Sequence, residues 1–505
     1  MNAILNLQKL AQFISDAKKA GKTVVLAHGC FDLLHPGHIR HLKAAKAHGD
    51  VLVVTVTPDK FVNKGPGRPV FSEELRLETL AALKFVDAVA LNQWPTAVET
   101  IKLLKPDVYI KGSEYRDYKN DPTGKITDEK EAVQGVGGRL EFTDEITFSS
   151  TSLLNVHFEV FPSEAEEYLR GLAQEYSFED LKSLFDAMEN WRVVVIGDTI
   201  VDEYTYVRPM GRVEKAPIVA CRYLGTELFA GGILAVANHV SNFVKQVDLV
   251  TVDGTDELFS QISSKIARNI RVHLYKRPDG PTTLKRRYLN KQDLNKMFAV
   301  EFMNDRPIPA QTETAILNEL GGILESSDLT VVADFGHGAI TQKIAEELQG
   351  RSKILAANAQ TNSSNFGFNP ITRFPKADFI SIDETELRIA TIGRFDSVES
   401  MLQRLREKIA CPRINITLGT KGSHYFSQEG DYFAPALTSS VVDTVGAGDA
   451  VLSVLSLCAA AGFPHQVMPF IGNCAGAIAA NILCNESSVK KSDLLKMIRT
   501  ALSWS

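Results

Sequence analysis

The stretch KTVVLAHGCFDLLHPGH, residues 22–38, joins a run of β-branched residues to a segment rich in Gly, Pro and His. The apolar run predicts a buried strand. Pro36 suits the first position of a helix, because its fixed φ is helical and its missing N–H would have no partner there. His35 then lies just before the first residue of that helix, and His38 lies in its first turn. Unpaired N–H groups and the helix dipole attract anions at this point, so the pattern favours a phosphate-binding strand–loop–helix unit.

Two other interpretations of this histidine pair stay open on the residues alone. The pair could ligate a metal, although zinc would need a third ligand at a suitable spacing and none is evident in the sequence. It could also be two polar side chains at the start of a surface helix.

Short β-branched runs alternate with helical patterns around this stretch, and the same alternation resumes after residue 192. Such alternation predicts parallel sheets covered by helices, hence an α/β fold. A chain of 505 residues is too long for one ordinary core. We therefore expect two three-layer α/β domains with mainly parallel sheets, residues 1–158 and 191–505, joined by a semi-rigid helical linker at 159–190.

Composition narrows the function classes. A net charge of −6 gives no electrostatic footprint for nucleic acid or for an acidic membrane. The most apolar stretch, residues 450–463, is shorter than the roughly 18 residues of a membrane-spanning helix. The six cysteines are scattered without a C-x-x-C pair, which is typical of reduced thiols in the cytoplasm. Small-molecule chemistry is the expectation.

The string from Gly29 to His38 fits the pattern G-x-F-D-x-x-H-x-G-H and resembles the signature of the cytidylyltransferase-like nucleotidyltransferases. NKGPGRPV (63–70), DVYIKGSEY (107–115) and FSSTSLLN (148–155) follow in the order of that family's later motifs. Within the family, the nucleotidyltransferase half of bifunctional heptose-phosphate enzymes looks most similar. The resemblance implies a Rossmann-like domain that transfers a nucleotidyl group from ATP or CTP to a sugar phosphate and releases pyrophosphate.

The same resemblance assigns residues to roles. Negative charge accumulates on phosphate oxygens during nucleotidyl transfer, so positioned cations and N–H donors lower the barrier and a protein nucleophile is hardly needed. The implied catalytic residues are His35, His38 and Lys64. The implied nucleotide- and phosphate-binding residues are Gly29, Phe31, Asp32, Gly37, Arg68, Lys111, Ser149, Ser150 and Thr151. The polar segment 116–138, absent from the shortest relatives, is expected to contribute a loop over the acceptor site.

A second stretch, VVDTVGAGDAVLSVLSLCAAAGFP at 441–464, joins a glycine-rich bend to a long apolar helix. Successive glycines let backbone N–H groups converge on an anion, and Asp449 stands where it can accept a proton. The alternative for Asp449 is a simple helix cap, but capping does not demand the preceding glycines. The phosphate loop G-x-x-x-x-G-K-[ST] is absent from the sequence, so this would be a different solution to phosphate binding.

The segment from Asp443 to Asp449 resembles the D-T-x-G-A-G-D signature of the ribokinase-like carbohydrate kinases, and VVVIGDTIVDEY (193–204), DETE (383–386) and TLGTKG (417–422) resemble its other motifs. The resemblance implies that Asp449 is the general base that deprotonates a sugar hydroxyl as it attacks the γ-phosphate of ATP. It also implies a small β lid, drawn here from residues 203–224 and 271–302, through which such proteins often form homodimers. The implied binding residues are Gly446, Ala447 and Gly448 for the anion, Thr417, Gly419 and Gly422 for the nucleotide, Asp198, Asp202, Gly231, Gly232 and Asn238 for the sugar, and Glu386 for Mg²⁺.

Several positions depart from the ribokinase-like pattern. ILAVAN (233–238) brings bulk after Gly232 and displaces the usual asparagine to Asn238, Asp383 replaces an asparagine, and AANAQ (356–360) replaces the Asp-Pro-Lys of heptose relatives. The two halves also stand in reversed order compared with the bifunctional heptose enzymes.

Three hypotheses follow. The favoured one is a bifunctional enzyme of nucleotide-sugar synthesis that needs Mg²⁺ in both halves, with a heptose as the favoured sugar. The second keeps an active nucleotidyltransferase and makes the kinase-like half a catalytically silent binding or dimerisation module. The third is a pure nucleotide or sugar sensor.

Overall fold

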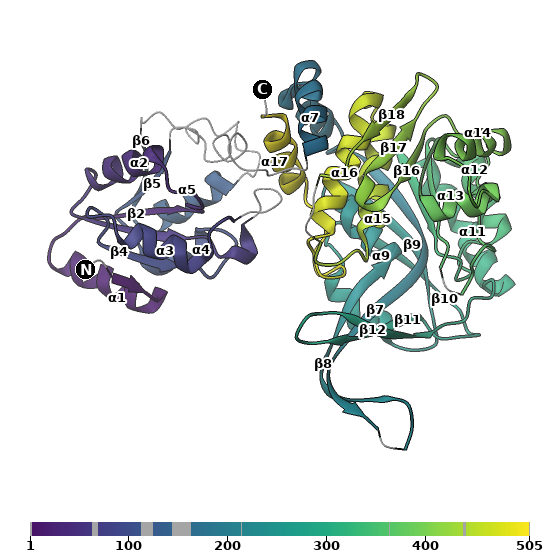
Figure 1. Ribbon diagram of the computed structural model, residues 1–505, viewed down its shortest axis with the longest axis horizontal. Helices are drawn as coiled ribbons and strands as arrows, with labels where there is room; N and C mark the ends of the chain where they lie inside the picture. Colours follow the sequence, from purple (N-terminus) through teal and green to yellow (C-terminus); the bar gives the residue numbers. More distant parts are fainter. Residues whose placement is uncertain are drawn as a thin grey trace. The chain divides into compact units, whose positions relative to one another are not determined.

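The computed structural model describes residues 3–62, 69–112, 125–143, 163–213, 215–362, 364–437 and 441–503. The chain divides into two compact units, a first unit of residues 1–163 with 495–505 and a second unit of residues 164–494. Figure 1 gives the elements of each. Both units are α/β, as the alternating sequence pattern predicts.

The first unit is built on a parallel sheet with strand order β1-β4-β3-β2-β5-β6. Its strands are β1 (Ala3–Leu5), β2 (Val24–Gly29), β3 (Val51–Val56), β4 (Ala88–Leu91), β5 (Val108–Gly112) and β6 (Arg139–Thr143). One face packs against α1 (Leu7–Lys19), α4 (Val98–Leu104) and α5 (Lys125–Gly135), and the other against α2 (Pro36–Lys46) and α3 (Glu73–Ala81). The chain moves from β2 to β3 on one side and later to β5 on the other. The carboxyl ends of β2 and β5 therefore form a topological switch point, where open α/β sheets bind ligands.

The central sheet of the second unit has the strand order β10-β9-β7-β13-β14-β15-β16-β17-β18. Neighbours are parallel as far as β16, and β17 and β18 are antiparallel. The strands are β7 (Arg192–Arg212), β9 (Gln246–Asp253), β10 (Ile270–Lys276), β13 (Leu329–Asp334), β14 (Leu355–Ala359), β15 (Phe379–Asp383), β16 (Ile414–Thr417), β17 (Ser423–Phe426) and β18 (Asp431–Ala434).

Strand β7 belongs to two sheets. Up to Asp198 it pairs with β9 and β13, and from Thr199 onward it pairs with β8 (Val219–Gly232) and β11 (Thr283–Asn290). With β12 (Lys296–Phe302), which pairs with β11, these strands form the lid. The predicted lid range 271–302 is wrong at its start, because residues 270–276 form β10 and extend the central sheet beside β9.

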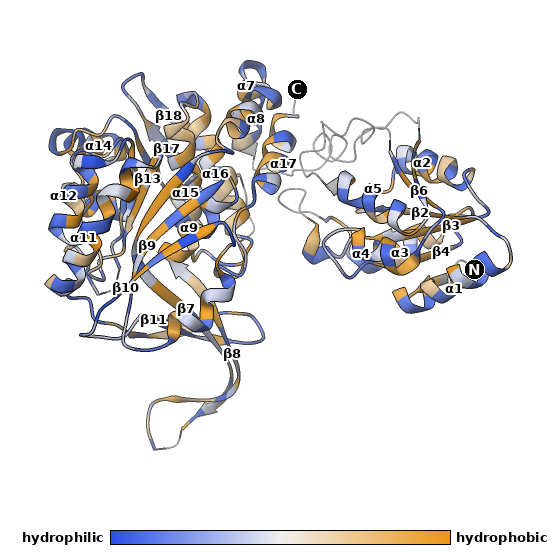
Figure 2. Ribbon diagram, turned by 180° about the vertical axis from the view of Figure 1, so that it is seen from behind, coloured by the Kyte–Doolittle hydropathy of each residue, from blue (hydrophilic) through white to orange (hydrophobic). Residues whose placement is uncertain are grey.

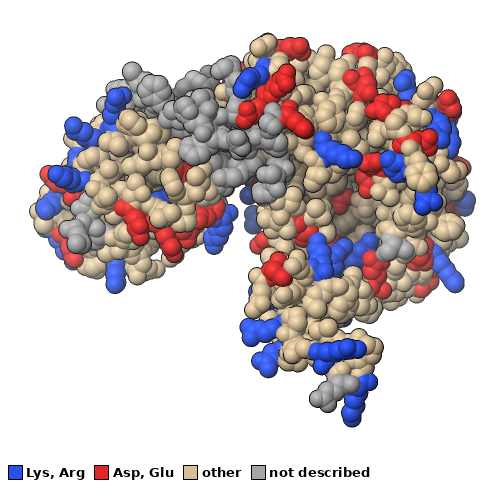
Figure 3. Space-filling view, viewed as in Figure 1, with Lys and Arg blue, Asp and Glu red and all other residues tan. Residues whose placement is uncertain are grey.

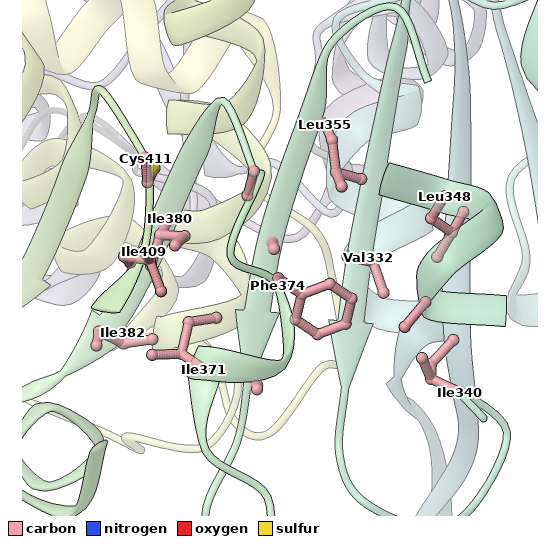
Figure 4. Packing of buried hydrophobic residues seen from close by; sticks show 14 of the residues in the cluster. Val332, Ile340, Leu348, Leu355, Ile371, Phe374, Ile380, Ile382, Ile409 and Cys411 are labelled. Carbon is pink, nitrogen blue, oxygen red and sulfur yellow. The ribbon is translucent and has the colours of Figure 1, made fainter. Parts of the chain in front are cut away.

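Helices cover both faces of the second unit's central sheet (Figure 1). On one face α11 (Ala310–Glu325), α12 (Gln342–Arg351), α13 (Glu384–Thr391) and α14 (Val398–Lys408) bury a large apolar cluster, part of which Figure 4 shows around Phe374. On the other face α15 (Ala447–Ala460) packs against α9 (Ile233–Ser241), α16 (Met468–Ala479) and β15. Figure 2 shows the apolar strands of this sheet between helices with polar outer faces. The remaining helices are α7 (Ser163–Glu175), α8 (Phe178–Ala187), α10 (Leu258–Ile262) and α17 (Lys491–Leu502).

The linker predicted at residues 159–190 is helical over its described part, since α7 and α8 lie within it. Helix α8 starts at a capping box in which Ser177 and Asp180 bond each other's backbone N–H. Both helices fall within the second unit. The division at residues 158 and 190 stays a prediction. Among the helices that the structure describes, none is long and apolar enough to span a bilayer.

Candidate active sites

The first candidate site lies at the carboxyl end of β2, where the loop of residues 30–35 leads into α2. His35 is the N-cap of α2, and its Nδ1 accepts a hydrogen bond of 3.1 Å from the backbone N–H of Gly37. A neutral His35 therefore carries its proton on Nε2 and can donate from there. The rings of His35 and His38 are 4.1 Å apart between centroids. The structure thus brings the two predicted catalytic histidines together at a helix N-terminus.

Two predicted binding residues of this loop serve its shape. Phe31 has a positive φ of 49° and packs its ring edge-on against His38 at 5.5 Å. The buried Asp32 carboxylate accepts the backbone N–H groups of Val70 (2.6 Å) and Phe71 (3.2 Å). A Cβ at Gly29 would come within 3.1 Å of the Phe31 ring, so a larger residue there would crowd this ring. Phe31 and Asp32 therefore hold the histidine loop against the segment after residue 69.

Arg76, on α3, is a structural partner of the same loop that the sequence analysis missed. Its fully buried guanidinium donates to the carbonyl oxygens of Cys30 (2.5 Å), Thr57 (2.8 Å) and Phe71 (3.0 Å) and to the Asp59 carboxylate (2.5 Å). One side chain thus joins the histidine loop to the end of β3 and to the segment before α3. The signal in the sequence is an arginine between two leucines on the apolar side of a predicted helix.

Lys111 lies near the carboxyl end of β5, as predicted, but its ammonium already has a partner. Its Nζ is 3.0 Å from Oε2 of Glu129, and the Tyr109 hydroxyl donates to the same oxygen at 3.0 Å. Burial opposes the ionisation of Glu129, but the charges of Lys111 and His28 prevail and lower its pKa. Glu129 belongs to α5. The described part of segment 116–138 is thus mainly a helix, which supplies a counter-charge to Lys111. The loop expected from part of this segment stays a prediction, because residues 116–124 lie outside the described residues.

His41 completes this end of the sheet. Its Nδ1 lies 2.8 Å from Oγ1 of Thr143, and burial together with the charge of Lys111 lowers its pKa to about 4. At neutral pH His41 is uncharged, so it adds no positive charge beside Lys111.

Five predicted residues of the first site, Lys64, Arg68, Ser149, Ser150 and Thr151, lie outside the described residues. Within the described ranges, no group of three or more His, Cys, Asp or Glu side chains is arranged to hold a metal ion.

The second candidate site is a cavity of about 300 Å³ in the second unit, where the central sheet meets the lid. Of the predicted residues, it is lined by Asp202, Gly232, Glu386, Thr417, Gly446, Gly448 and Asp449. These come from distant points of the sequence, and the crossover of β7 from sheet to lid brings Asp202 into the same space as the glycine bend.

Asp449, in the first turn of α15, is buried at this cavity. Burial and then the charge of Asp202 raise its pKa to about 7, while Lys285 and a hydrogen bond from Gln360 oppose the shift. The Gln360 Nε2 donates to Oδ1 of Asp449 at 3.0 Å. A carboxylate that titrates near neutral pH suits general-base catalysis. Gln360 directly follows β14, at the end of the segment AANAQ that departs from the ribokinase-like pattern. The sequence analysis did not predict it as a site residue.

The glycine bend is fixed by its surroundings. Gly446 has a φ of 85°, and a Cβ there would come within 2.1 Å of Oδ1 of Asn485, so only glycine fits. Gly448 and Asp449 lie in the first turn of α15, where helix N–H groups lack intrahelical acceptors. The Ala447 N–H donates to the Thr444 carbonyl at 3.3 Å, and Ala447 does not line the cavity. Of the three residues of the predicted anion hole, Gly446 and Gly448 therefore lie at the cavity wall.

The part of the cavity wall contributed by the lid strands carries both signs of charge. Asp202 forms an ion pair with Arg287, and both line the cavity. Lys285, two residues earlier on β11, lines it as well. A Cβ at Gly231 would come within 2.0 Å of Oδ2 of Asp202, so this glycine makes room for the carboxylate. Lys285 and Arg287 were missed, although their alternate positions in TLKRRYLN place them on one face of a strand.

Asp383 and Glu386 form a capping box at the start of α13, and both line the cavity. Asp383 accepts the N–H of Glu386 at 2.7 Å, and Glu386 accepts the N–H groups of Asp383 (2.9 Å) and Thr361 (3.1 Å). Burial, then the charge of Asp383, raises the pKa of Glu386 to about 8. A hard cation such as Mg²⁺ would favour the charged form of Glu386 beside the oxygen atoms of Asp383.

Asp198, a predicted sugar ligand, does not line the cavity. Its carboxylate accepts the backbone N–H groups of Phe335 (3.0 Å), His337 (3.3 Å) and Ala339 (2.9 Å). It therefore fixes the loop between β13 and α12.

Asn238, another predicted sugar ligand, does not line the cavity either. Its amide donates to the carbonyl of Lys265 (2.9 Å) and accepts the N–H of Ala267 (3.0 Å). Both of its polar ends are thus satisfied by backbone groups, and the prediction of a displaced sugar ligand is not supported. The bulky Ile233 and Leu234 are fully buried without lining the cavity.

The predicted nucleotide glycines lie beside the cavity. Gly419 and Gly422 have φ values of 60° and 110° and flank the short turn after β16. Thr417, at the end of β16, is the residue of this motif that reaches the cavity wall. The two glycines therefore shape the turn, with no contact to the cavity itself.

Two family models match the chain. Residues 26–156 match the cytidylyltransferase-like family, and residues 191–483 match the pfkB family of carbohydrate kinases. Two curated relatives, both called bifunctional protein HldE, are 37% identical over 147 residues (Syntrophotalea carbinolica) and 40% identical over 151 residues (Geobacter metallireducens). The matched stretches cover 29% and 30% of this chain and 29% of each relative.

Among solved structures, ribokinase from Arabidopsis thaliana in complex with ribose and ATP aligns with a TM-score of 0.48 and 17% identity, over 62% of this chain and 99% of that one. The pfkB model alone spans more than half of the sequence. The chain therefore belongs to the pfkB family of carbohydrate kinases, with a cytidylyltransferase-like segment ahead of the kinase.

Proposed function

We propose that the chain is a bifunctional enzyme of nucleotide-sugar synthesis. The second unit phosphorylates a hydroxyl of a sugar or sugar phosphate with ATP, and the first unit transfers a nucleotidyl group from ATP or CTP to a sugar phosphate with release of pyrophosphate. The observation that carries the proposal is the cavity in which Asp449, Asp202 and the glycine bend meet. The motifs of the first unit favour a heptose as the sugar. Because the curated relatives are matched over less than a third of their length, the pairing of the two activities is itself part of the proposal.

In the kinase reaction, Asp202 and its partner Arg287 orient the acceptor. Asp449 accepts the proton of the attacking hydroxyl, whose oxygen bonds to the γ-phosphorus while the bond from that phosphorus to the bridging oxygen of ADP breaks. Backbone N–H groups at Gly446 and Gly448 stabilise charge on the moving phosphoryl group. Glu386, with Asp383 beside it, would hold Mg²⁺, which screens the triphosphate.

In the nucleotidyl reaction, a phosphate oxygen of the acceptor attacks the α-phosphorus, and pyrophosphate leaves. His35 and His38 donate hydrogen bonds to the phosphate oxygens, and the N-terminus of α2 adds its dipole. Lys64 and Arg68 would neutralise charge from the neighbouring segment, and residues 149–151 would add donors.

A catalytically silent kinase-like half was the main alternative, and the bulk of Ile233 and Leu234 motivated it. Both side chains pack into the core without lining the cavity, which stays open beside Asp449. This observation favours a kinase that turns over.

We also propose that the second unit forms a homodimer through the lid. Large apolar side chains on the β7–β8 hairpin are exposed, among them Tyr223 (64%) and Met210 (58%). Patches of this kind mark interaction surfaces. Cys221, Cys411, Cys458, Cys474 and Cys484 are free thiols, which supports a reducing compartment such as the cytoplasm.

Two substitutions in the full-length protein test the assignment of the two sites. Asp449→Asn should lower ATP-dependent sugar phosphorylation by about 10²–10⁴-fold, because the proton acceptor is lost, and should leave pyrophosphate release unchanged. His38→Ala should do the reverse. Pyrophosphate release is measured over four nucleoside triphosphates against a panel of sugar 1-phosphates, and phosphorylation over the matching free sugars and sugar phosphates.

The two-site assignment would be wrong if either substitution silenced both activities in folded protein. If calorimetry found sugar binding without turnover by the wild type across the panel, the silent module would replace the kinase.

A further inference from the structure

Asp443, the first residue of the glycine-bend motif, has a buried carboxylate with four donors around it. Its Oδ1 accepts from Lys296 Nζ (2.5 Å) and from the Val445 N–H (3.0 Å). Its Oδ2 accepts from the Tyr204 hydroxyl (2.6 Å) and from the Cys484 N–H (3.1 Å). Burial opposes its ionisation, but Lys296 and Tyr204 prevail and lower the pKa of Asp443. The carboxylate is therefore charged and fully coordinated.

Two of these donors join the lid to the glycine bend. Tyr204 lies on the lid half of β7 and Lys296 opens β12, so both come from lid strands. Asp443 directly precedes residues 444–446, which line the cavity. Its backbone N–H donates to the Ala480 carbonyl at 3.1 Å, so the bend is held from behind by backbone and from the lid side by the carboxylate.

The charge on Asp443 needs a counter-charge. A buried carboxylate without one is strongly disfavoured, and neutral donors such as the Tyr204 hydroxyl do not remove its charge. The Lys296 ammonium supplies that charge, and since its side chain stays 35% exposed, it keeps part of its own hydration.

We propose that Lys296 is a positioning residue for phosphoryl transfer, a built-in counter-ion that acts through Asp443 to hold the N–H groups of the glycine bend in place for the moving phosphoryl group. This inference rests on the proposed kinase function. It predicts that the bend keeps its anion-binding geometry without any monovalent cation from solution. A chain that lacks the Lys296 ammonium should come to depend on such a cation.

The test compares Lys296→Met with Lys291→Met in the full-length protein. Lys291 is the matched control, because it lies in the same β11–β12 hairpin with its Nζ 3.9 Å from the centre of the Tyr206 ring, and it is not one of the four donors to Asp443. Calorimetry measures the binding of MgADP alone and of MgADP with aluminium fluoride, which mimics the phosphoryl group in transfer. The buffer contains tetramethylammonium as its sole monovalent cation, and K⁺ or NH₄⁺ is then added.

The wild type and Lys291→Met should bind MgADP more tightly when aluminium fluoride is present. Lys296→Met should lose about tenfold or more of this enhancement, as when an oxyanion donor is misplaced, while its affinity for MgADP alone stays unchanged. Added K⁺ or NH₄⁺ should restore the enhancement. The double variant Lys296→Met/Asp443→Asn, which removes both charges, should keep most of it without an added cation.

Full enhancement in Lys296→Met without added cation overturns the inference. So does a loss that neither small cation reverses and that Asp443→Asn does not relieve, because the lysine would then have a structural role only. A wild type that shows no enhancement and phosphorylates no sugar overturns the kinase function together with this inference.

Discussion

At the scale of single residues, Asp449 shows how burial adapts a carboxylate to accept a proton near neutral pH. Desolvation and the charge of Asp202 push its pKa up, and the opposing effects of Lys285 and Gln360 leave it at about 7. The folded protein thus keeps a base that is strong enough to accept a hydroxyl proton and still largely ionised at slightly alkaline pH.

The pH dependence of the kinase reaction should report this pKa. Below about pH 7 Asp449 is protonated and cannot act as a base, so kcat/KM for sugar phosphorylation should fall about tenfold for each pH unit and level off above pH 7. Gln360→Ala removes a donor that favours the ionised form, so it should move the profile to higher pH. Initial rates at low sugar concentration measure both profiles. A profile that levels off near pH 4 in the wild type would contradict the role of Asp449.

The sequence was informative for residues inside continuous motifs and uninformative for their partners. Asp449 and Asp202 could be found because they stand in recognisable segments. Gln360 and Arg287 could not, because each reaches its carboxylate through strand order in the folded sheet. Asp198 was misjudged because a motif carboxylate that caps backbone N–H groups looks the same in sequence as one that binds a sugar.

At the scale of elements, the first unit shows how a segment outside the family motifs supports one inside them. Helix α5 brings the buried Glu129 to the largely buried side chain of Lys111 on β5. Pairing of this kind offsets the cost of burying each charge, and removing one partner takes that compensation away from the other.

Glu129→Gln should destabilise the first unit by up to about 3–5 kcal/mol, because it breaks a largely buried ion pair with Lys111. Lys111→Met in the same chain should recover most of the lost stability. It should not recover pyrophosphate release, because it removes a predicted nucleotide-binding residue. Urea unfolding and differential scanning calorimetry of the four proteins of this double-mutant cycle measure the stabilities. As the control, Glu99→Gln breaks an exposed pair with Lys102 and should cost less than about 1 kcal/mol. Equal effects at Glu129 and Glu99 would show that the buried pair has no special role.

Elements were predictable where the local pattern is complete. The start of α2 at Pro36 and the helices of the connector follow from caps and periodicity. The division of β7 between two sheets could not be predicted in this way. The same β-branched pattern runs on through residues 192–207, while the hydrogen-bond partners of the strand change at Asp198. The placement of β10 in the central sheet was missed for the same reason, since sequence shows a strand but not the sheet that receives it.

At the scale of the whole molecule, the alternating pattern was enough to predict two α/β units, because each parallel sheet needs helices on both faces. The pattern carries no information on assembly, which depends on the exposed face of the lid. The β7–β8 hairpin exposes Arg208, Arg212, Lys215 and Arg222 along with its apolar side chains, and Figure 3 shows Lys and Arg gathered at the end of this hairpin.

A homodimer through the lid should therefore bring like charges together around an apolar contact. Sedimentation equilibrium should give twice the 55.5 kDa chain mass, and dimerisation should strengthen as salt screens the arginines. Tyr223→Asp should yield a monomer, because it places a charge in the apolar contact. Phe395→Asp changes a side chain that is 88% exposed and lies outside the lid, so it should leave the dimer intact. A monomeric wild type would rule out the homodimer. A dimer that survives Tyr223→Asp and weakens in high salt would place the association outside the apolar side chains of the lid.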